Sequence, residues 1–99
     1  MEIVKNRQGN ELEIALEGKL DTASAPKFEA VIKNELEGVE KLVLNLAKLK
    51  YTSSAGLRAI LLAQKTMNKQ GEMILRNVGE EVLDVFDMTG LEDLFTIER

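Results

Sequence analysis

The sequence predicts an α/β domain built on a mixed β-sheet, with the element order ββαβαβαβ. Leu12, Ile14 and Leu16 alternate with Glu11, Glu13 and Glu17, a period of two that is typical of a strand with one buried face. Residues 41–49 form a more continuous apolar run, as expected for a strand covered on both sides. Segments with helical spacing separate the later strands, and this alternation favours parallel βαβ units with right-handed crossovers.

The first half of the chain predicts an antiparallel hairpin followed by a helix. Residues 3–4 form a short strand candidate, and "NRQGN" supplies the Gly and Asn that a tight turn before residues 11–17 requires. A helix is expected to begin between residues 22 and 25, because Pro26 is tolerated only in a first turn. The candidate caps of this helix are Asp21, Thr22 and Ser24.

The second half continues the alternation. The run at 41–49 is expected in the centre of the sheet, and a helix beginning near Ser54 ends at Gly71. After it, "EMILRNV" predicts a strand, "EEVLDVFDMTG" a short helix and "LFTIE" a last strand. Phe86 and Leu91 are expected in the core.

Composition narrows the possible functions. The 99 residues suit a single domain, 1–99, and 13 basic against 17 acidic residues, with the basic ones scattered, argue against nucleic acid as a partner. Without Cys or His the chain lacks the usual metal ligands and the usual general base, so we expect no metal, no cofactor and no enzymatic activity. No secretory signal or membrane span is apparent, which predicts a cytoplasmic protein.

Two serine-containing loops follow predicted strands. Because functional groups of open α/β sheets gather at the carboxyl ends of strands, "LDTASAP" and "KYTSSAG" are expected to be neighbours. Serine is a preferred N-cap residue, so either Ser53 or Ser54 is expected to cap the helix that follows. A capping role does not exclude a second, functional role for either serine.

Serines at such a position can serve three kinds of chemistry: nucleophilic catalysis, nucleotide binding and acceptance of a phosphoryl group. A serine nucleophile needs a base, yet the chain has no His, and Gly56 and Leu57 stand where an S-x-x-K motif would place its Lys. "SSAG" matches neither glycine-rich nucleotide-binding pattern. A phosphoryl group accepted from another protein remains, because phosphoserine adds about −1.5 to −2 charges and would repel an acidic or apolar partner surface.

Three segments in order, "GKLDTASAP", "LVLNLAKLKYTSSAGLRAILLA" and "VFDMTGL", resemble the STAS domain family, and more specifically its single-domain bacterial anti-sigma factor antagonists. The resemblance covers nearly the whole chain and implies a STAS-like fold. It also implies that the unphosphorylated protein binds an anti-sigma factor serine kinase and so releases a sigma factor, that phosphorylation ends this binding, and that a serine phosphatase restores it.

The family pattern places the acceptor two positions before the glycine, which selects Ser54 ahead of Gly56. Ser53 stands where the family often has Asp and is the alternative acceptor. The resemblance implies a partner-binding surface made of Asp21, Thr22, Ser53, Ser54, Gly56, Leu57 and Arg58. An alternative function is that of a STAS interaction subunit in a signalling scaffold or lipid-transport complex without a phospho-switch, and the oligomeric state stays open.

Overall fold

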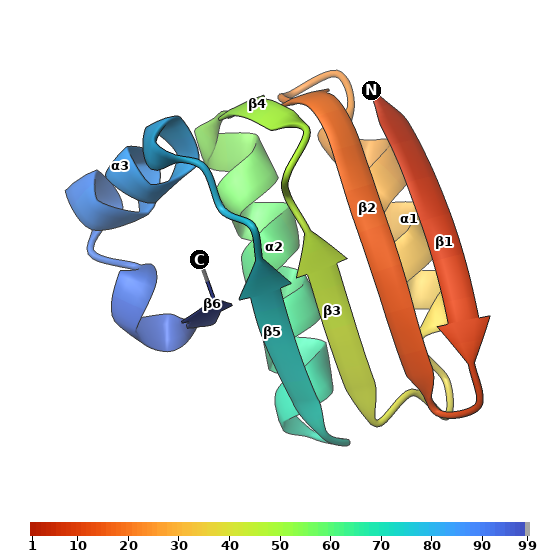
Figure 1. The fold of residues 1–99 in the computed structure, drawn as a ribbon. Helices are drawn as coiled ribbons and strands as arrows, with labels where there is room; N and C mark the ends of the chain where they lie inside the picture. The colour runs from red at the N-terminus through yellow and green to blue at the C-terminus, as the bar shows by residue number, and fades with distance from the viewer. Residues whose placement is uncertain (99) are drawn as a thin grey trace.

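A computed structural model describes residues 1–98, which form a six-stranded mixed sheet and three α-helices (Figure 1). The strands are β1 (Glu2–Gln8), β2 (Glu11–Leu20), β3 (Lys41–Asn45), β4 (Leu49–Thr52), β5 (Glu72–Arg76) and β6 (Thr96–Glu98). The helices are α1 (Ala25–Glu35), α2 (Ser54–Asn68) and α3 (Glu80–Thr89), with a 3₁₀ turn, η1 (Glu92–Leu94).

The sheet has the strand order β1-β2-β3-β5-β6, and β4 pairs with β2 outside this path. β1 and β2 are antiparallel, whereas β2–β3, β3–β5, β5–β6 and β2–β4 are all parallel pairs. The predicted α/β class, the N-terminal hairpin and the βαβ units are therefore confirmed, and β3 lies in the centre of the sheet as expected.

The predicted strand over residues 41–49 ends at Asn45, and a further strand, β4, begins at Leu49, so the order becomes ββαββαβαβ. The Asn45 side chain accepts a hydrogen bond from the Ala47 N–H at 3.1 Å, and the Leu49 N–H donates to the Leu46 carbonyl at 3.1 Å, which together turn the chain. Leu46 and Leu49 are nevertheless buried. The apolar run hides the turn, because burial of these leucines continues through it.

β1 is also longer than residues 3–4. Its seven residues pair with β2 without interruption, from Glu2 opposite Glu17 to Gln8 opposite Glu11. Most of β1 is exposed and polar, so no apolar alternation marks its length. Pairing with the neighbouring strand extends β1 beyond the segment that the apolar pattern predicts.

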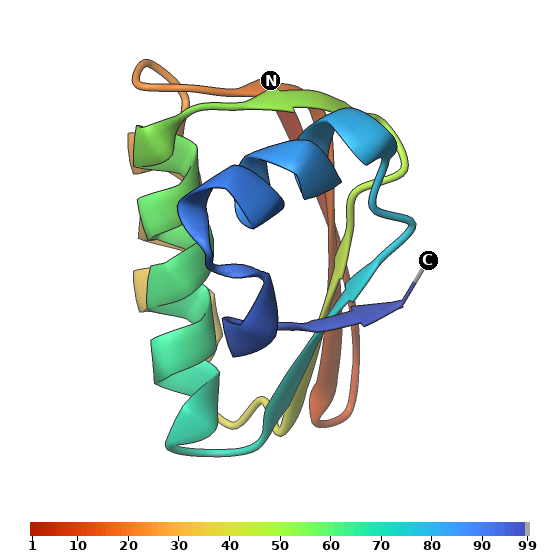
Figure 2. The same cartoon turned by 90° about the vertical axis from the view of Figure 1, so that its left-hand side faces the viewer.

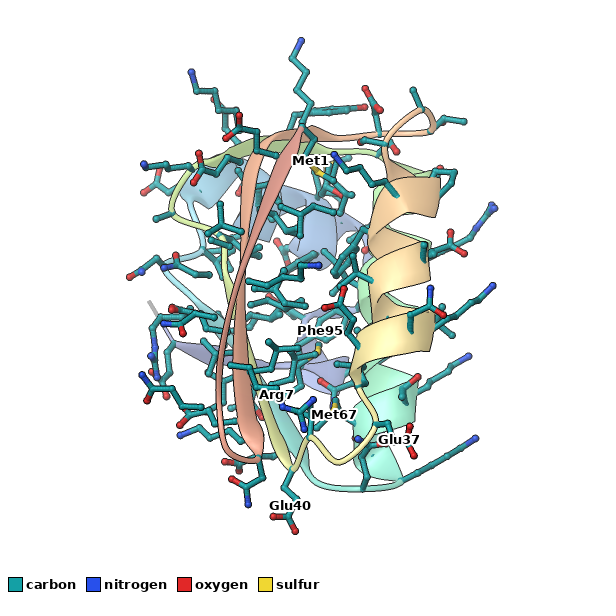
Figure 3. All side chains as sticks on the ribbon, turned by 90° about the vertical axis from the view of Figure 1, so that its right-hand side faces the viewer. Met1, Arg7, Glu37, Glu40, Met67 and Phe95 are labelled. Carbon is teal, nitrogen blue, oxygen red and sulfur yellow. The ribbon has the colours of Figure 1, made fainter. Side chains whose placement is uncertain are left out.

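Helices α1 and α2 cover one face of the sheet, and the main core lies between the two layers (Figure 2). The alternating Leu12, Ile14 and Leu16 of β2 all face this core and are buried. Figure 3 shows Met67 and Phe95 in the same space between the sheet and the helices. The glutamates of β2 lie on the opposite, solvent-facing side, as their alternation predicts.

Helix α3 packs beside β4, and the chain then returns through η1 to β6 (Figure 2). Phe86 of α3 is fully buried and its ring centroid lies 5.3 Å from that of Phe95. Leu91 is partly buried against the core. Phe86 therefore has the core position expected from the sequence, whereas Leu91 lies at the edge of the core.

Candidate functional site

The two serine-containing loops lie side by side. β2 and β4 run parallel and end together, with Leu20 opposite Thr52 in the ladder. The ladder continues for one further bond, in which the Ser53 N–H donates to the Leu20 carbonyl at 2.9 Å. Gly18, with φ of +104°, lies where the β2–β4 register shifts, a conformation that suits glycine. This pairing brings residues 21–24 next to the start of α2.

Ser53 is the N-cap of α2. Its backbone is extended, with φ of −94° and ψ of 177°, and its Oγ accepts a hydrogen bond from the Gly56 N–H at 3.3 Å. The Ser53 carbonyl accepts the first helical bond, from the Leu57 N–H at 2.9 Å. The expectation that one of the two serines caps the helix is confirmed, and the cap is Ser53.

Ser54 is the first residue of α2 and its side chain is exposed. Within residues 1–98 its hydroxyl makes no hydrogen bond to another protein group, whereas the Ser53 hydroxyl is occupied by the cap. A phosphoryl donor can therefore reach the Ser54 Oγ without breaking an interaction of the fold. The two hydroxyls differ because Ser53 has the extended backbone of an N-cap, whereas Ser54 is already helical.

Gly56 permits the close contact between α2 and the end of β2. A Cβ at this position would lie 2.6 Å from the Leu20 carbonyl oxygen and 2.8 Å from Leu20 Cγ, both too short for van der Waals contact. The glycine is buried in the first turn of the helix. Its role is to let the helix start approach the strand and so place Ser54 at the surface.

The predicted partner-binding residues do not all lie on the surface. Leu57 is only 3% exposed and packs into the main core, and Gly56 is buried beside it. Thr22 and Arg58 are exposed, and Asp21 is half-buried. Residues 56 and 57 are buried because this side of α2 faces the sheet, and their contact with a partner stays a prediction.

Asp21 organises the loop between β2 and α1. Its Oδ1 accepts hydrogen bonds from the backbone N–H groups of Ala23 and Ser24 at 3.1 and 3.0 Å, and the Ser24 hydroxyl lies 3.1 Å away. These bonds, chiefly those from Ser24, hold the pKa of the Asp21 carboxyl below its ordinary value. The N-cap of α1 is Ser24, which makes no side-chain capping bond, so the Asp21 carboxylate orders the turn ahead of the helix and does not cap its first turn.

Tyr51 is an exposed aromatic residue outside the predicted partner-binding set. It lies on β4, three positions before Ser54, pairs with Lys19 in the ladder and is 48% exposed. Tyrosine is enriched in protein interfaces, so this exposed side chain is a further candidate for contact with a partner. The sequence did not indicate that Tyr51 is exposed, because the strand β4 that carries it was not predicted.

Replacing Ser53 with Ala is expected to lower the free energy of unfolding by about 1 kcal/mol, because the Gly56 N–H loses its side-chain acceptor. Urea denaturation followed by circular dichroism measures this loss. Ser54→Ala is the matched control and should leave stability nearly unchanged. Equal losses in the two variants would contradict the assignment of Ser53 as the cap.

The fold and this surface define a small α/β domain that presents an exposed serine at the start of a helix. The family model described as "STAS domain" matches residues 2–99, so the chain belongs to the STAS domain family. No helix of residues 1–98 is both long enough and apolar enough to cross a membrane.

Two relatives and one pair of structures illustrate the similarity. The protein BtrV of Bordetella bronchiseptica is 32% identical over 99 residues, which cover 98% of this chain and 85% of BtrV. The anti-sigma-B factor antagonist of Bacillus subtilis is 30% identical, with 89% of this chain and 82% of that protein covered. The structure of the anti-sigma factor antagonist SpoIIAA in its unphosphorylated form superposes with a TM-score of 0.78 at 19% identity, covering 99% of this chain and 88% of SpoIIAA. The phosphorylated form of Bacillus SpoIIAA gives 0.77 at 20% identity, covering 99% and 92%.

Proposed function

We propose that this protein is an anti-sigma factor antagonist whose unphosphorylated form binds an anti-sigma factor and thereby releases a sigma factor. The observation that carries the proposal is the difference between the two serines: the Ser53 hydroxyl is occupied as the helix cap, whereas the exposed Ser54 hydroxyl bonds to no other group of residues 1–98. The relatives named anti-sigma-B factor antagonists support the same role.

Ser54 is the proposed phosphoacceptor. A phosphate there extends into solvent from the first turn of α2, where the helix dipole favours negative charge. The fold therefore tolerates the modification, and its effect falls on the surface that a partner covers. About −1.5 to −2 added charges would repel an acidic or apolar partner surface and end binding.

The partners follow from this mechanism. The anti-sigma factor is proposed to be the serine kinase that modifies Ser54, and a serine phosphatase is proposed to reverse the modification. ATP then binds in the kinase, so this chain needs no cofactor of its own and acts without enzymatic activity. The exchange is proposed to take place in the cytoplasm, where the sigma factor meets RNA polymerase.

The test is to incubate the protein with ATP and each anti-sigma-type serine kinase of the same genome, and then to measure intact mass and map the phosphopeptide. One added phosphate on Ser54 is expected, absent from Ser54→Ala and retained in Ser53→Ala. Phosphate on Ser53 would keep the switch and overturn the assigned residue. No phosphate with any kinase would overturn the proposal in favour of a scaffold or lipid-transport subunit.

A further inference from the structure

Helix α2 places a guanidinium next to the proposed phosphoacceptor. Arg58 lies four residues after Ser54, and both side chains are exposed. Residues four apart share one face of a helix, with their Cβ atoms about 5–6 Å apart. Because helical side chains lean toward the N-terminus, the Arg58 side chain is expected to reach toward Ser54.

The surroundings leave this guanidinium available. Helix α2 contains no Asp or Glu, so no carboxylate on the same helix competes for Arg58. The ion pairs within residues 1–98 join Lys5 to Glu35, Lys41 to Glu11 and Arg76 to Glu98, and none includes Arg58. An exposed arginine with no acidic partner beside a phosphorylatable hydroxyl has the geometry of a phosphate ligand.

We propose that Arg58 binds the phosphate of phosphorylated Ser54 within the same helix. This inference rests on the proposed function, because it requires a phosphate at Ser54. The planar guanidinium donates to two phosphate oxygens at once, which an ammonium group does not do. Phosphorylation then has two effects on the docking surface: it adds negative charge, and it withdraws a basic side chain that the unphosphorylated protein offers to its partner.

Lys65 supplies the matched control. It is an exposed basic residue of the same helix, but it follows Ser54 by eleven positions, about 16 Å along the axis. That separation exceeds the Debye length of about 10 Å at 0.1 M salt, so Lys65 contributes little to the energy of a phosphate at Ser54. Arg58→Gln and Lys65→Gln remove the same charge from the same helix.

The test uses phosphoserine incorporated genetically at position 54, so that no kinase is needed and failure of the kinase experiment remains a separate result. The unfolding equilibrium constant is measured by urea denaturation for the phosphorylated and unphosphorylated forms of each variant. Phosphate is expected to lower the unfolding equilibrium constant of the unchanged chain, and this lowering should be about two- to fivefold smaller in Arg58→Gln. In Lys65→Gln the lowering should be the same as in the unchanged chain. An equal fall in both variants, or no fall in either, would overturn the proposal.

A spectroscopic measurement separates phosphate binding from a merely structural role of Arg58. In ¹⁵N-labelled protein, the Arg58 Nε–H resonance is expected to shift downfield and to exchange more slowly with water when Ser54 carries phosphate. The Nε–H resonance of Arg76, which already pairs with Glu98 through Nε, should stay unchanged. An unmoved Arg58 resonance in the phosphorylated protein would overturn the proposal even if stability changed.

Discussion

Ser54→Asp is expected to weaken binding to the anti-sigma factor by at least about tenfold, whereas Ser54→Ala should bind as the unchanged protein does. The carboxylate places a negative charge on the exposed first turn of α2, where the partner is proposed to dock. A tenfold loss corresponds to about 1.4 kcal/mol, within the range that a misplaced charge at an interface produces. Isothermal titration calorimetry with the purified anti-sigma factor measures it.

Ser54→Asn is the control for shape. Asparagine is nearly isosteric with aspartate and uncharged, so a difference between the two variants reports charge alone. Aspartate in a first helical turn also interacts favourably with the helix dipole, so Ser54→Asp should keep or slightly raise the melting temperature. If the Ser54→Asp and Ser54→Asn variants bind the anti-sigma factor equally well, the proposal of an electrostatic switch is wrong.

Gly56→Ala is expected to destabilise the fold by about 1–3 kcal/mol, which is the usual cost of overpacking a buried site. In an ordinary helix interior the same change is favourable by roughly 1 kcal/mol, so the expected sign is reversed here. The reversal has a geometric cause, since the added methyl would lie 2.6 Å from the Leu20 carbonyl oxygen. Urea denaturation gives the change in the free energy of unfolding.

Gly79→Ala is the matched control for this substitution. A Cβ at Gly79 meets no described atom within 4 Å, and its φ of −74° is accessible to any residue. Alanine there should change stability by less than about 1 kcal/mol. Equal effects at the two glycines would show that the contact between Gly56 and Leu20 does not constrain the start of α2.

Gly56→Ala should also slow the phosphorylation of Ser54 by the kinase, because the added methyl shifts the helical turn that carries Ser54.

Local patterns were sufficient to predict most of the fold. The alternation in β2 identified the residues that face the core, and helical spacing located α1, α2 and α3. The pattern failed at residues 41–49, because Leu46 and Leu49 stay buried through a turn whose hydrogen bonds involve Asn45. It also failed for β1, since an exposed polar strand takes its extent from pairing with β2.

The candidate site was predicted in part. The spacing of the sequence placed both serines at the start of a helix, and the adjacency of the two loops followed from the expected parallel strands. The sequence did not predict which serine is the cap, because the two residues are of the same type and either position suits a cap. The burial of Leu57 was equally hidden in the resemblance, which identifies positions of a motif but not the direction in which each side chain points.

By itself, the sequence determined the fold class, the family and the pair of serines, because periodicity and motif spacing are properties of neighbouring residues. Only the tertiary structure decided that Ser53 is occupied and Ser54 is free, that Gly56 must lack a side chain, and that Tyr51 is exposed. The space around Gly56 and the exposure of Tyr51 depend on how β4 pairs with β2, a contact between segments about thirty residues apart, whereas the state of the two serines depends on where α2 begins. Such contacts decide between local conformations that the sequence pattern does not distinguish.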